Sequence, residues 1–381
     1  MHYSAAGILI FCEASQATSG SDKQTPLKLL FLSKRRPQGR DLIERPYGRF
    51  HYLPSHLARS GHEVRTLLGS YLDEPEFTGE IDGVQYQSSR MFPNLVQYRH
   101  RAIEIARAWE PDVVVGCSDT WFGILAASLA RRTGARLVID AYDNYEAYLP
   151  AARPLHWLWR RALGRADGLT AAGPQLLQLL QQSNSRAAAA VVPMCADPVF
   201  APQAPDEARA RLGLPLDRKL VGYLGTADRT RGFALLEETM TSLMAHRQDF
   251  DVVISGRSEV QLALPAGRVH TLGYIDDELM PALNSACDLL LCLNRDSAFG
   301  NYSYPVKIYE AIACRRPVLA SASEPARWIL ADENRALVEQ ENAADLARQV
   351  SAMLDEPLIL PAAAGWEASA GRFEALLNEI G

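Results

Sequence analysis

The sequence predicts an α/β protein of two domains, each a parallel sheet covered by helices. Short apolar, β-branched runs alternate with helical stretches along the chain, which is typical of repeated β-α-β units. The 381 residues are enough for two domains of roughly 100–200 residues each. A proline-rich segment, residues 191–205, lacks helical periodicity and predicts a linker between the halves.

The expected elements follow one another in the order strand, helix, strand. In the first half, we expect helices at 49–60, 96–109, 121–133, 153–166 and 173–182, and strands at Lys28–Leu32, Glu63–Leu68, Asp112–Gly116, Arg136–Asp140, Gly168–Ala171 and Ala190–Pro193. In the second half, we expect strands at Lys219–Leu224, Asp251–Ser255, Val269–Leu272, Leu289–Leu293, Pro317–Ala320 and Ala336–Val338.

The ends of the chain are expected to be separate elements. Residues 1–26 read as a tail, 27–195 as the first domain, 196–364 as the second, and 365–381 as a terminal helix. Trp366, Phe373, Leu377 and Ile380 lie on one helical face, which either domain could bury.

The composition is that of a soluble globular protein, with 48% hydrophobic and 22% charged residues. The net charge of −6 argues against a nucleic-acid partner, since such proteins are usually strongly basic. The charge is unevenly distributed. Residues 1–195 contain 22 basic and 18 acidic residues, a net charge of +4, and the remainder contains 17 and 27, a net charge of −10. We therefore expect the halves to meet different partners.

The cysteines and the hydropathy pattern indicate a cytoplasmic protein. None of the six cysteines forms a CxxC pair or a zinc-finger spacing with histidine, so buried free thiols are expected. The sequence contains no run of about 18 apolar residues, the length that a membrane-spanning helix needs.

The segment Asn301–Ser321 carries the most informative pattern. Pro305 can begin a helix on which Lys307 and Glu310, three residues apart, share a face, and a strand follows directly. A cation, a carboxylate and a helix N-terminus would then meet at the edge of a parallel sheet, where such sheets bind ligands. A diphosphate suits the cation and the free N–H groups, and a ribose diol suits the carboxylate. A plain surface ion pair is the alternative.

The segment Gly222–Leu236 has a strand, a glycine-containing loop with Arg229 and Arg231, and a helix. Glycine permits close approach of a ligand to the backbone, and arginine can neutralise phosphate oxygens. A solvated turn with two exposed arginines would look similar.

These segments resemble the family 4 glycosyltransferases (glycosyl transferases group 1). LVGYLGTADRTRG, DVVISGR and PVKIYEAIACRRPVLAS resemble, in order, the phosphate loop, a strand ending in glycine, and the donor helix. In the first half, RFHYLPSHLARSGHEV and LVIDAYDNYEAY resemble acceptor-side segments, and GWEASAGRFEALL resembles a helix that crosses back to the first domain. The resemblance covers residues 27–381 and implies the GT-B fold, two Rossmann-like domains facing across a cleft.

The resemblance also implies roles for single residues. Glu310 would bind the ribose, and Lys307 with Arg231 would bind the diphosphate, with Arg229 as a helper and Gly225 in the phosphate loop. Tyr274 would lie near the base, Asp143 would face the reacting sugar, and Gly48 would be a close-approach glycine before the first helix. The donor would be a nucleotide-diphosphate sugar, transferred with retention to a glycan or lipid-linked acceptor in polysaccharide or glycolipid assembly. No DxD motif lies at a strand end, so we expect neither a metal ion nor another cofactor.

Three positions depart from the family pattern. Tyr302 replaces a frequent glutamate, Tyr142 replaces a frequent histidine, and Arg315–Arg316 replaces a glycine. The first two leave a non-catalytic nucleotide-sugar-binding scaffold as an alternative, and a nucleotide-sugar epimerase of the same fold is another.

Trp157 has two interpretations. On the expected helix 153–166, the apolar stripe contains Leu155, Leu158 and Trp159, whereas Trp157 shares its side with Arg160 and Arg161. Trp157 either fills a groove against a neighbouring loop or makes a weak contact with the inner membrane surface.

Overall fold

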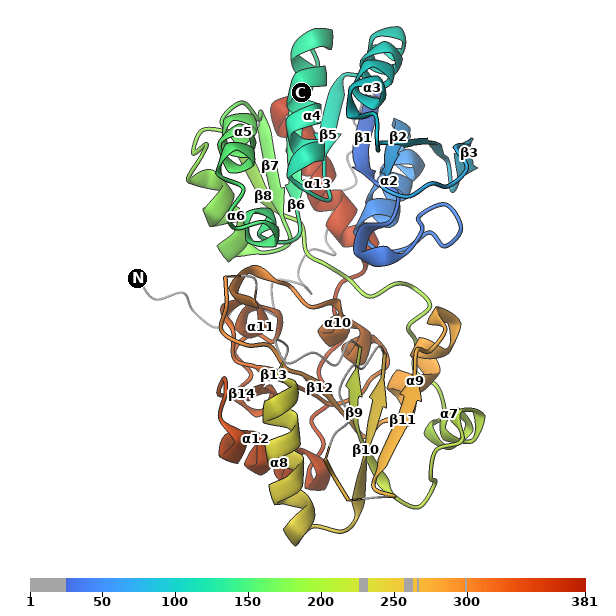
Figure 1. The fold of residues 1–381 in the computed structure, drawn as a ribbon, viewed down its shortest axis with the longest axis vertical. Coiled ribbons are helices and arrows are strands. Elements are labelled where there is room, and N and C mark those ends of the chain that lie inside the picture. Colours follow the sequence, from blue (N-terminus) through green and yellow to red (C-terminus); the bar gives the residue numbers. More distant parts are fainter. Residues whose placement is uncertain (1–24, 226–231, 257–262, 266, 299) are drawn as a thin grey trace. The chain divides into compact units, whose positions relative to one another are not determined.

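The computed structural model describes residues 25–225, 232–256, 263–265, 267–298 and 300–381 (Figure 1). The described residues fall into two compact units. The first unit contains residues 25–194 and 364–381, and the second contains residues 195–363. These divisions lie one residue from the predicted boundaries at 195/196 and 364/365.

The first unit contains an eight-stranded sheet in the order β3-β4-β2-β1-β5-β6-β7-β8. Every pair of neighbours is parallel except β3–β4. The strands are β1 Lys28–Lys34, β2 Glu63–Ser70, β3 Phe77–Ile81, β4 Val84–Arg90, β5 Val113–Gly116, β6 Arg136–Ala141, β7 Gly168–Ala171 and β8 Ala188–Val191. The helices are α2 Arg49–Arg59, α3 Leu95–Trp109, α4 Thr120–Thr133, α5 Arg153–Leu163, α6 Pro174–Gln181 and α13 Trp366–Ile380, with 3₁₀ turns η2 Pro37–Gly39 and η3 Tyr145–Tyr148.

The predicted strands of the first half are present, with one shift and one omission. The last strand is β8, which begins and ends two residues earlier than expected. The sequence analysis missed the β3–β4 hairpin at the sheet edge. Asp82 and Gly83 join its strands with φ of 49° and 80°, and two positive φ values are the requirement of a type I′ turn. The Asp-Gly pair was therefore a readable hairpin signal.

The terminal helix α13 belongs to the first unit. It packs against α2, β7 and β8 (Figure 1). Its expected apolar face is buried, since Trp366, Phe373, Leu377 and Ile380 are each at most 5% exposed. The Trp366 ring stacks on Tyr52 of α2 with the centroids 5.7 Å apart. The predicted return of this helix to the first domain is confirmed.

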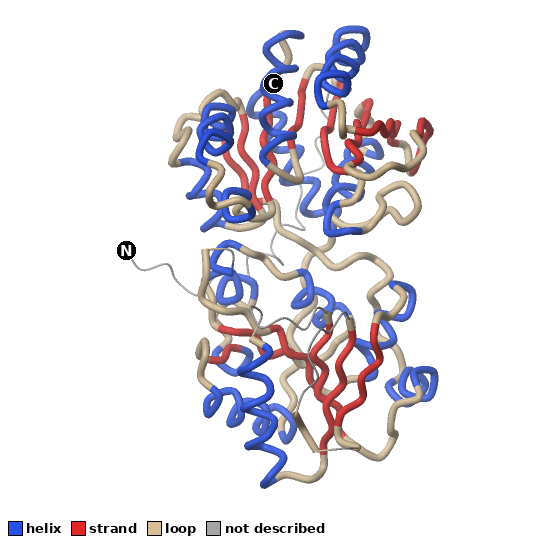
Figure 2. The backbone as a smooth tube through the Cα atoms, in the orientation of Figure 1, coloured by secondary structure: helices blue, strands red, loops and turns tan. Residues whose placement is uncertain are grey.

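The second unit contains a six-stranded, all-parallel sheet in the order β11-β10-β9-β12-β13-β14 (Figure 2). Its strands are β9 Lys219–Leu224, β10 Phe250–Ser255, β11 Val269–Gly273, β12 Leu289–Cys292, β13 Val318–Ser321 and β14 Leu337–Val338. Its helices are α7 Pro205–Leu212, α8 Phe233–His246, α9 Met280–Ala286, α10 Val306–Ala313, α11 Glu324–Ile329 and α12 Ala343–Asp355, with 3₁₀ turns η5 Asp277–Leu279, η6 Gly300–Tyr302 and η7 Asn334–Ala336.

The interior of each unit is apolar, because helices cover both faces of a parallel sheet. The core of the second unit includes Val221, Phe250 and Leu289 from three adjacent strands. The five cysteines in the described part of the chain are buried and free, as predicted. No helix among the described residues is long and apolar enough to cross a membrane.

A buried ion pair connects α2 to the middle of the first sheet. The Arg49 guanidinium donates to both Asp140 oxygens, at 2.7 and 2.5 Å, and to the Val192 carbonyl at 2.6 Å. Thr170 on β7 donates a further hydrogen bond to Asp140. Both charged side chains are at most 3% exposed, so each buried charge is compensated by the other.

Replacing Arg49 by Met should therefore destabilise the first unit by about 3–5 kcal/mol, because Asp140 is left as an unpaired buried charge. The matched control is Arg160→Ala, which removes an ion pair to Glu146 from a 62% exposed side chain and should cost at most about 1 kcal/mol. Urea unfolding followed by tryptophan fluorescence reports on this unit, since five of the six tryptophans lie in it. Equal effects of the two substitutions would contradict the expectation.

Candidate active site

The second sheet has a topological switch point between β9 and β12. β9 lies between β10 and β12, so the crossovers that leave β9 and β12 run in opposite directions. Such a switch of direction opens a crevice in which open α/β sheets bind ligands. The residues that follow β9, β10 and β11 at the carboxyl edge of the sheet are therefore the first candidates for a site.

Three glycines line this edge. Gly225 follows β9, Gly256 follows β10 and Gly273 ends β11, with φ of 118°, 105° and 66°, values that L side chains rarely adopt. Gly225 N–H donates to Ser255 O at 2.9 Å, and Gly256 N–H donates to Gly273 O at 2.6 Å. A Cβ on Gly256 would overlap the Gly225 carbonyl. The edge is thus a bare backbone surface that a ligand can approach closely.

Lys307 lies directly over this surface. A Cβ on Gly225 would overlap the Lys307 Nζ, so the ammonium group occupies the space that the missing side chain leaves. Lys307 and Glu310 are both half-buried and lie one turn apart on α10, whose N-cap is Pro305. The structure therefore brings the predicted cation to the predicted glycine loop, with the carboxylate on the same helix.

The other predicted donor residues have different outcomes. Tyr274 directly follows Gly273, and its side chain is 62% exposed. Arg229 and Arg231 lie outside the described residues. Arg315, where the family has glycine, adopts φ of 53° just beyond α10, a left-handed conformation that glycine adopts without strain.

In the first unit, Gly48 and Asp143 belong to loops at the carboxyl edge of the sheet. Gly48 precedes α2 with φ of 60°, and a Cβ there would meet no other atom within 4 Å. The backbone conformation rather than crowding therefore requires glycine. Asp143 follows β6 and is 7% exposed, and the Tyr148 hydroxyl donates to its Oδ2 at 2.7 Å.

Tyr142 is buried in the core of the first unit. It is 6% exposed and packs edge-on against Phe50 with the ring centroids 5.3 Å apart. Burial, followed by the nearby Asp143 charge, raises the pKa of its phenol well above the usual value. Its hydroxyl forms a long hydrogen bond of 3.3 Å with the Tyr148 hydroxyl.

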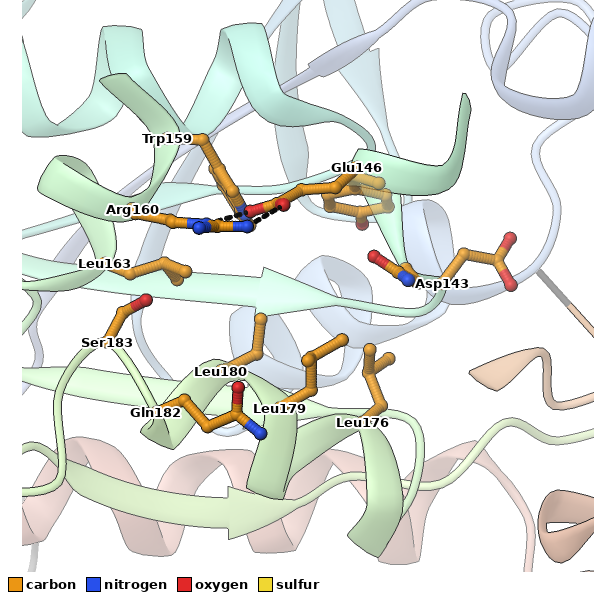
Figure 3. Close-up of a pocket in the computed structure, with 12 residues that line it drawn as sticks. Asp143, Glu146, Trp159, Arg160, Leu163, Leu176, Leu179, Leu180, Gln182 and Ser183 are labelled. Carbon is orange, nitrogen blue, oxygen red and sulfur yellow. Dashed lines mark hydrogen bonds and ion pairs between the residues drawn. The ribbon is translucent and has the colours of Figure 1, made fainter. Parts of the chain in front are cut away.

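A cavity of about 290 Å³ lies beside the loop that holds Asp143, between η3, α5 and α6 (Figure 3). Leu163, Leu176 and Trp159 form its apolar wall. Glu146 and Arg160 lie on its polar side, joined by two hydrogen bonds of 2.8 and 2.6 Å. Asp143 lies at one end, with its carboxylate directed away from the leucines (Figure 3).

The sequence analysis noted Gly256 as the end of the motif DVVISGR but gave it no role, and it named none of the partners of Asp143. Tyr148 lies only five residues after Asp143, but its role depends on the turn η3, which the sequence pattern did not predict.

Two families of known proteins match the chain. Residues 205–370 match the glycosyl transferases group 1, and residues 49–195 match the glycosyl transferase 4-like domain. The chain belongs to the group 1, family 4-like glycosyltransferases.

Solved structures give the fold of this glycosyltransferase. Sucrose-phosphate synthase from Thermosynechococcus elongatus is 19% identical with a TM-score of 0.67, over 94% of this chain and 96% of that chain. HepE from Anabaena, in complex with UDP, is 18% identical with a TM-score of 0.68, over 93% and 98% of the two chains. The fold is therefore GT-B, with two α/β domains as predicted. No curated protein matches the chain in sequence.

Tyr142 packs in the core of the glycosyltransferase, and Tyr142→Phe removes one long hydrogen bond. This variant should therefore keep turnover within about threefold of wild type. Tyr148→Phe removes the short hydrogen bond to Asp143 and should lower turnover about tenfold. Initial rates across pH 6–9 measure both variants. A turnover loss confined to Tyr142→Phe would show that residue 142 takes part in the reaction.

Proposed function

We propose that this glycosyltransferase moves a sugar from a nucleotide-diphosphate sugar to an acceptor hydroxyl, with retention of configuration and without a metal ion. The observation that carries the proposal is the position of Lys307, whose ammonium group lies over the bare Gly225 backbone at the switch point of the second sheet. HepE, a relative in fold, has been solved with UDP and with UDP-glucose.

Each donor group has a matching protein group in this proposal. The diphosphate lies against Gly225 and is neutralised by Lys307 and Arg231, with Arg229 as a second arginine. Glu310 accepts hydrogen bonds from the ribose hydroxyls, because a carboxylate is an acceptor with two oxygens. The exposed Tyr274 lies next to the base.

The reaction depends on fixed positive charge. As the glycosidic bond breaks, negative charge grows on the leaving diphosphate, and a cation already in place stabilises that state more than the ground state. Lys307 and Arg231 provide this charge in the proposed mechanism, in place of a divalent ion. Asp143 faces the acceptor side of the reacting sugar.

The test is a panel of nucleotide sugars incubated with the purified protein, with and without EDTA. A transferase releases nucleotide slowly by donor hydrolysis, an epimerase changes the sugar, and a scaffold binds without turnover. Loss of turnover on EDTA treatment and its recovery with manganese would overturn the metal-free mechanism.

In the same assay, Glu310→Ala should weaken UDP binding about 10- to 100-fold, because a charged hydrogen-bond acceptor is lost. Lys307→Ala should lower turnover at least about 100-fold and affect binding less, because its charge matters most as the diphosphate leaves. Glu207→Ala, an exposed change on α7, is the matched control. Wild-type kinetics in both folded site variants would exclude the donor-site assignment.

The acceptor in this proposal is a glycan or lipid-linked glycan of a polysaccharide or glycolipid pathway, and the protein works in the cytoplasm at the inner membrane face. Support comes from α5. Trp157 is 62% exposed, so the interpretation of it as filling a groove is wrong, and Leu149 and Leu158 are 55% and 40% exposed. The Arg161 guanidinium lies 5.7 Å from the Trp157 ring centroid. Exposed indole with arginine suits a headgroup region.

Co-sedimentation with phosphatidylglycerol vesicles at low salt measures this contact. Wild type should pellet weakly, and salt should abolish pelleting. Trp157→Ala with Arg161→Glu should remain in the supernatant. Arg160 is left unchanged, because its ion pair with Glu146 would confound the comparison. Equal pelleting of the two proteins would exclude α5, and no pelleting of wild type would favour a soluble acceptor.

A further inference from the structure

The first sheet has a switch point of its own, and its side chains have no role in the proposed donor chemistry. β1 lies between β2 and β5, so the crevice opens beyond the carboxyl ends of β1 and β5. Lys34 ends β1, and Ser118 and Asp119 follow β5. Ser118 is fully buried with φ of 71°, a strained left-handed conformation for serine. The Lys34 backbone N–H donates a hydrogen bond to Ser118 Oγ at 2.9 Å.

A neutral polar network occupies this crevice. The Lys34 ammonium lies 3.1 Å from Asp119 Oδ2, and the Tyr71 hydroxyl donates to the same oxygen at 3.0 Å. Asp119 Oδ1 caps α4 by accepting from the backbone N–H groups of Trp121 and Phe122. The cation and the carboxylate offset each other, so the network carries no net charge with which to attract an anion.

Three partly exposed aromatic side chains come from the segments that follow β2, β4 and β5 at the same edge of the first sheet. Tyr71 is 38% exposed, and Phe92 and Trp121 are each 40% exposed. The rings of Tyr71 and Phe92 stack with their centroids 5.5 Å apart. A Cβ on Gly69 would overlap both Met91 and Phe122, so the segments that carry Phe92 and Trp121 meet at the end of β2. We call Lys34, Tyr71, Phe92, Asp119 and Trp121 the aromatic platform.

The aromatic platform is connected to the loop of Asp143. The Lys34 Nζ lies 5.8 Å from the centroid of the Tyr148 ring, and the Tyr148 hydroxyl donates to Asp143 at 2.7 Å. A ligand on the platform would therefore lie next to the carboxylate that the proposed function places on the acceptor side.

We propose that the aromatic platform binds a neutral sugar residue of the acceptor. Exposed aromatic faces pack against the C–H groups of a sugar ring, and the Lys34–Asp119–Tyr71 network supplies donors and an acceptor for its hydroxyls. The network has no excess positive charge with which to bind an anion. A lipid tail would have to cover an ion pair whose lysine is 22% exposed. That the bound sugar is the acceptor rests on the proposed function, whereas the binding itself does not.

The experiment titrates the full chain, without donor, against methyl glycosides of glucose, galactose and mannose and against maltose and cellobiose. Saturation-transfer NMR and tryptophan fluorescence report binding. At least one probe should bind saturably. Phe92→Ala and Trp121→Ala should each weaken that binding at least about tenfold, whereas Phe92→Tyr and Trp121→Phe, which keep an aromatic face, should stay within about threefold.

The outcomes separate this proposal from the donor assignment. Calorimetric UDP binding should be the same in all four variants, because the donor groups lie in the other unit, and circular dichroism confirms that each variant is folded. Sugar binding without UDP binding would overturn the donor site and leave the platform in place. The platform is overturned if no probe binds, or if the alanine variants bind the sugar as wild type does. Loss of binding in the aromatic-preserving variants also overturns it.

Discussion

The strand order of the two sheets decides where each unit can hold a ligand. In both, the first strand of the unit lies inside the sheet with later strands on either side. The connections that leave β1 and β5, and those that leave β9 and β12, therefore run in opposite directions. Because the connecting loops run to opposite sides, they leave a crevice above the strand ends. Both sites discussed above occupy such crevices, at β9–β12 and at β1–β5.

The two crevices are lined by different kinds of residues. The second sheet ends in glycines, and the Lys307 ammonium occupies the space beside Gly225 that a side chain would fill, so positive charge lies where phosphate oxygens could bind. The first sheet ends in side chains that hold one another, from Tyr71 through Asp119 to Lys34. Such a lining suits a ligand with many hydroxyl groups and little charge. The buried Arg49–Asp140 pair holds α2 against β6, the neighbour of β5.

Most of the fold could be predicted because its strands are buried apolar runs. β1 contains the apolar run LLFL and β5 contains VVV, whereas β4 reads VQYQSSR and was not predicted. The donor groups could be predicted because Lys307 and Glu310 share one helix. The aromatic platform could not, because Lys34, Tyr71 and Asp119 lie at the ends of three separate strands and only the strand order brings them together. Likewise, the sequence places Tyr142 in the family's histidine position but does not indicate that its ring packs on Phe50.

The packing of α13 bears on how the chain folds during synthesis. Domains usually fold as they leave the ribosome, the N-terminal one first. Here the first unit needs Phe373 and Leu377 to complete its core, and these residues are made after those of the second unit. The second unit, encoded between, can fold while the first still exposes the apolar surface of α2, β7 and β8. Premature termination shortly before Trp366 would therefore damage the unit that is made first, and leave the unit nearest the break intact.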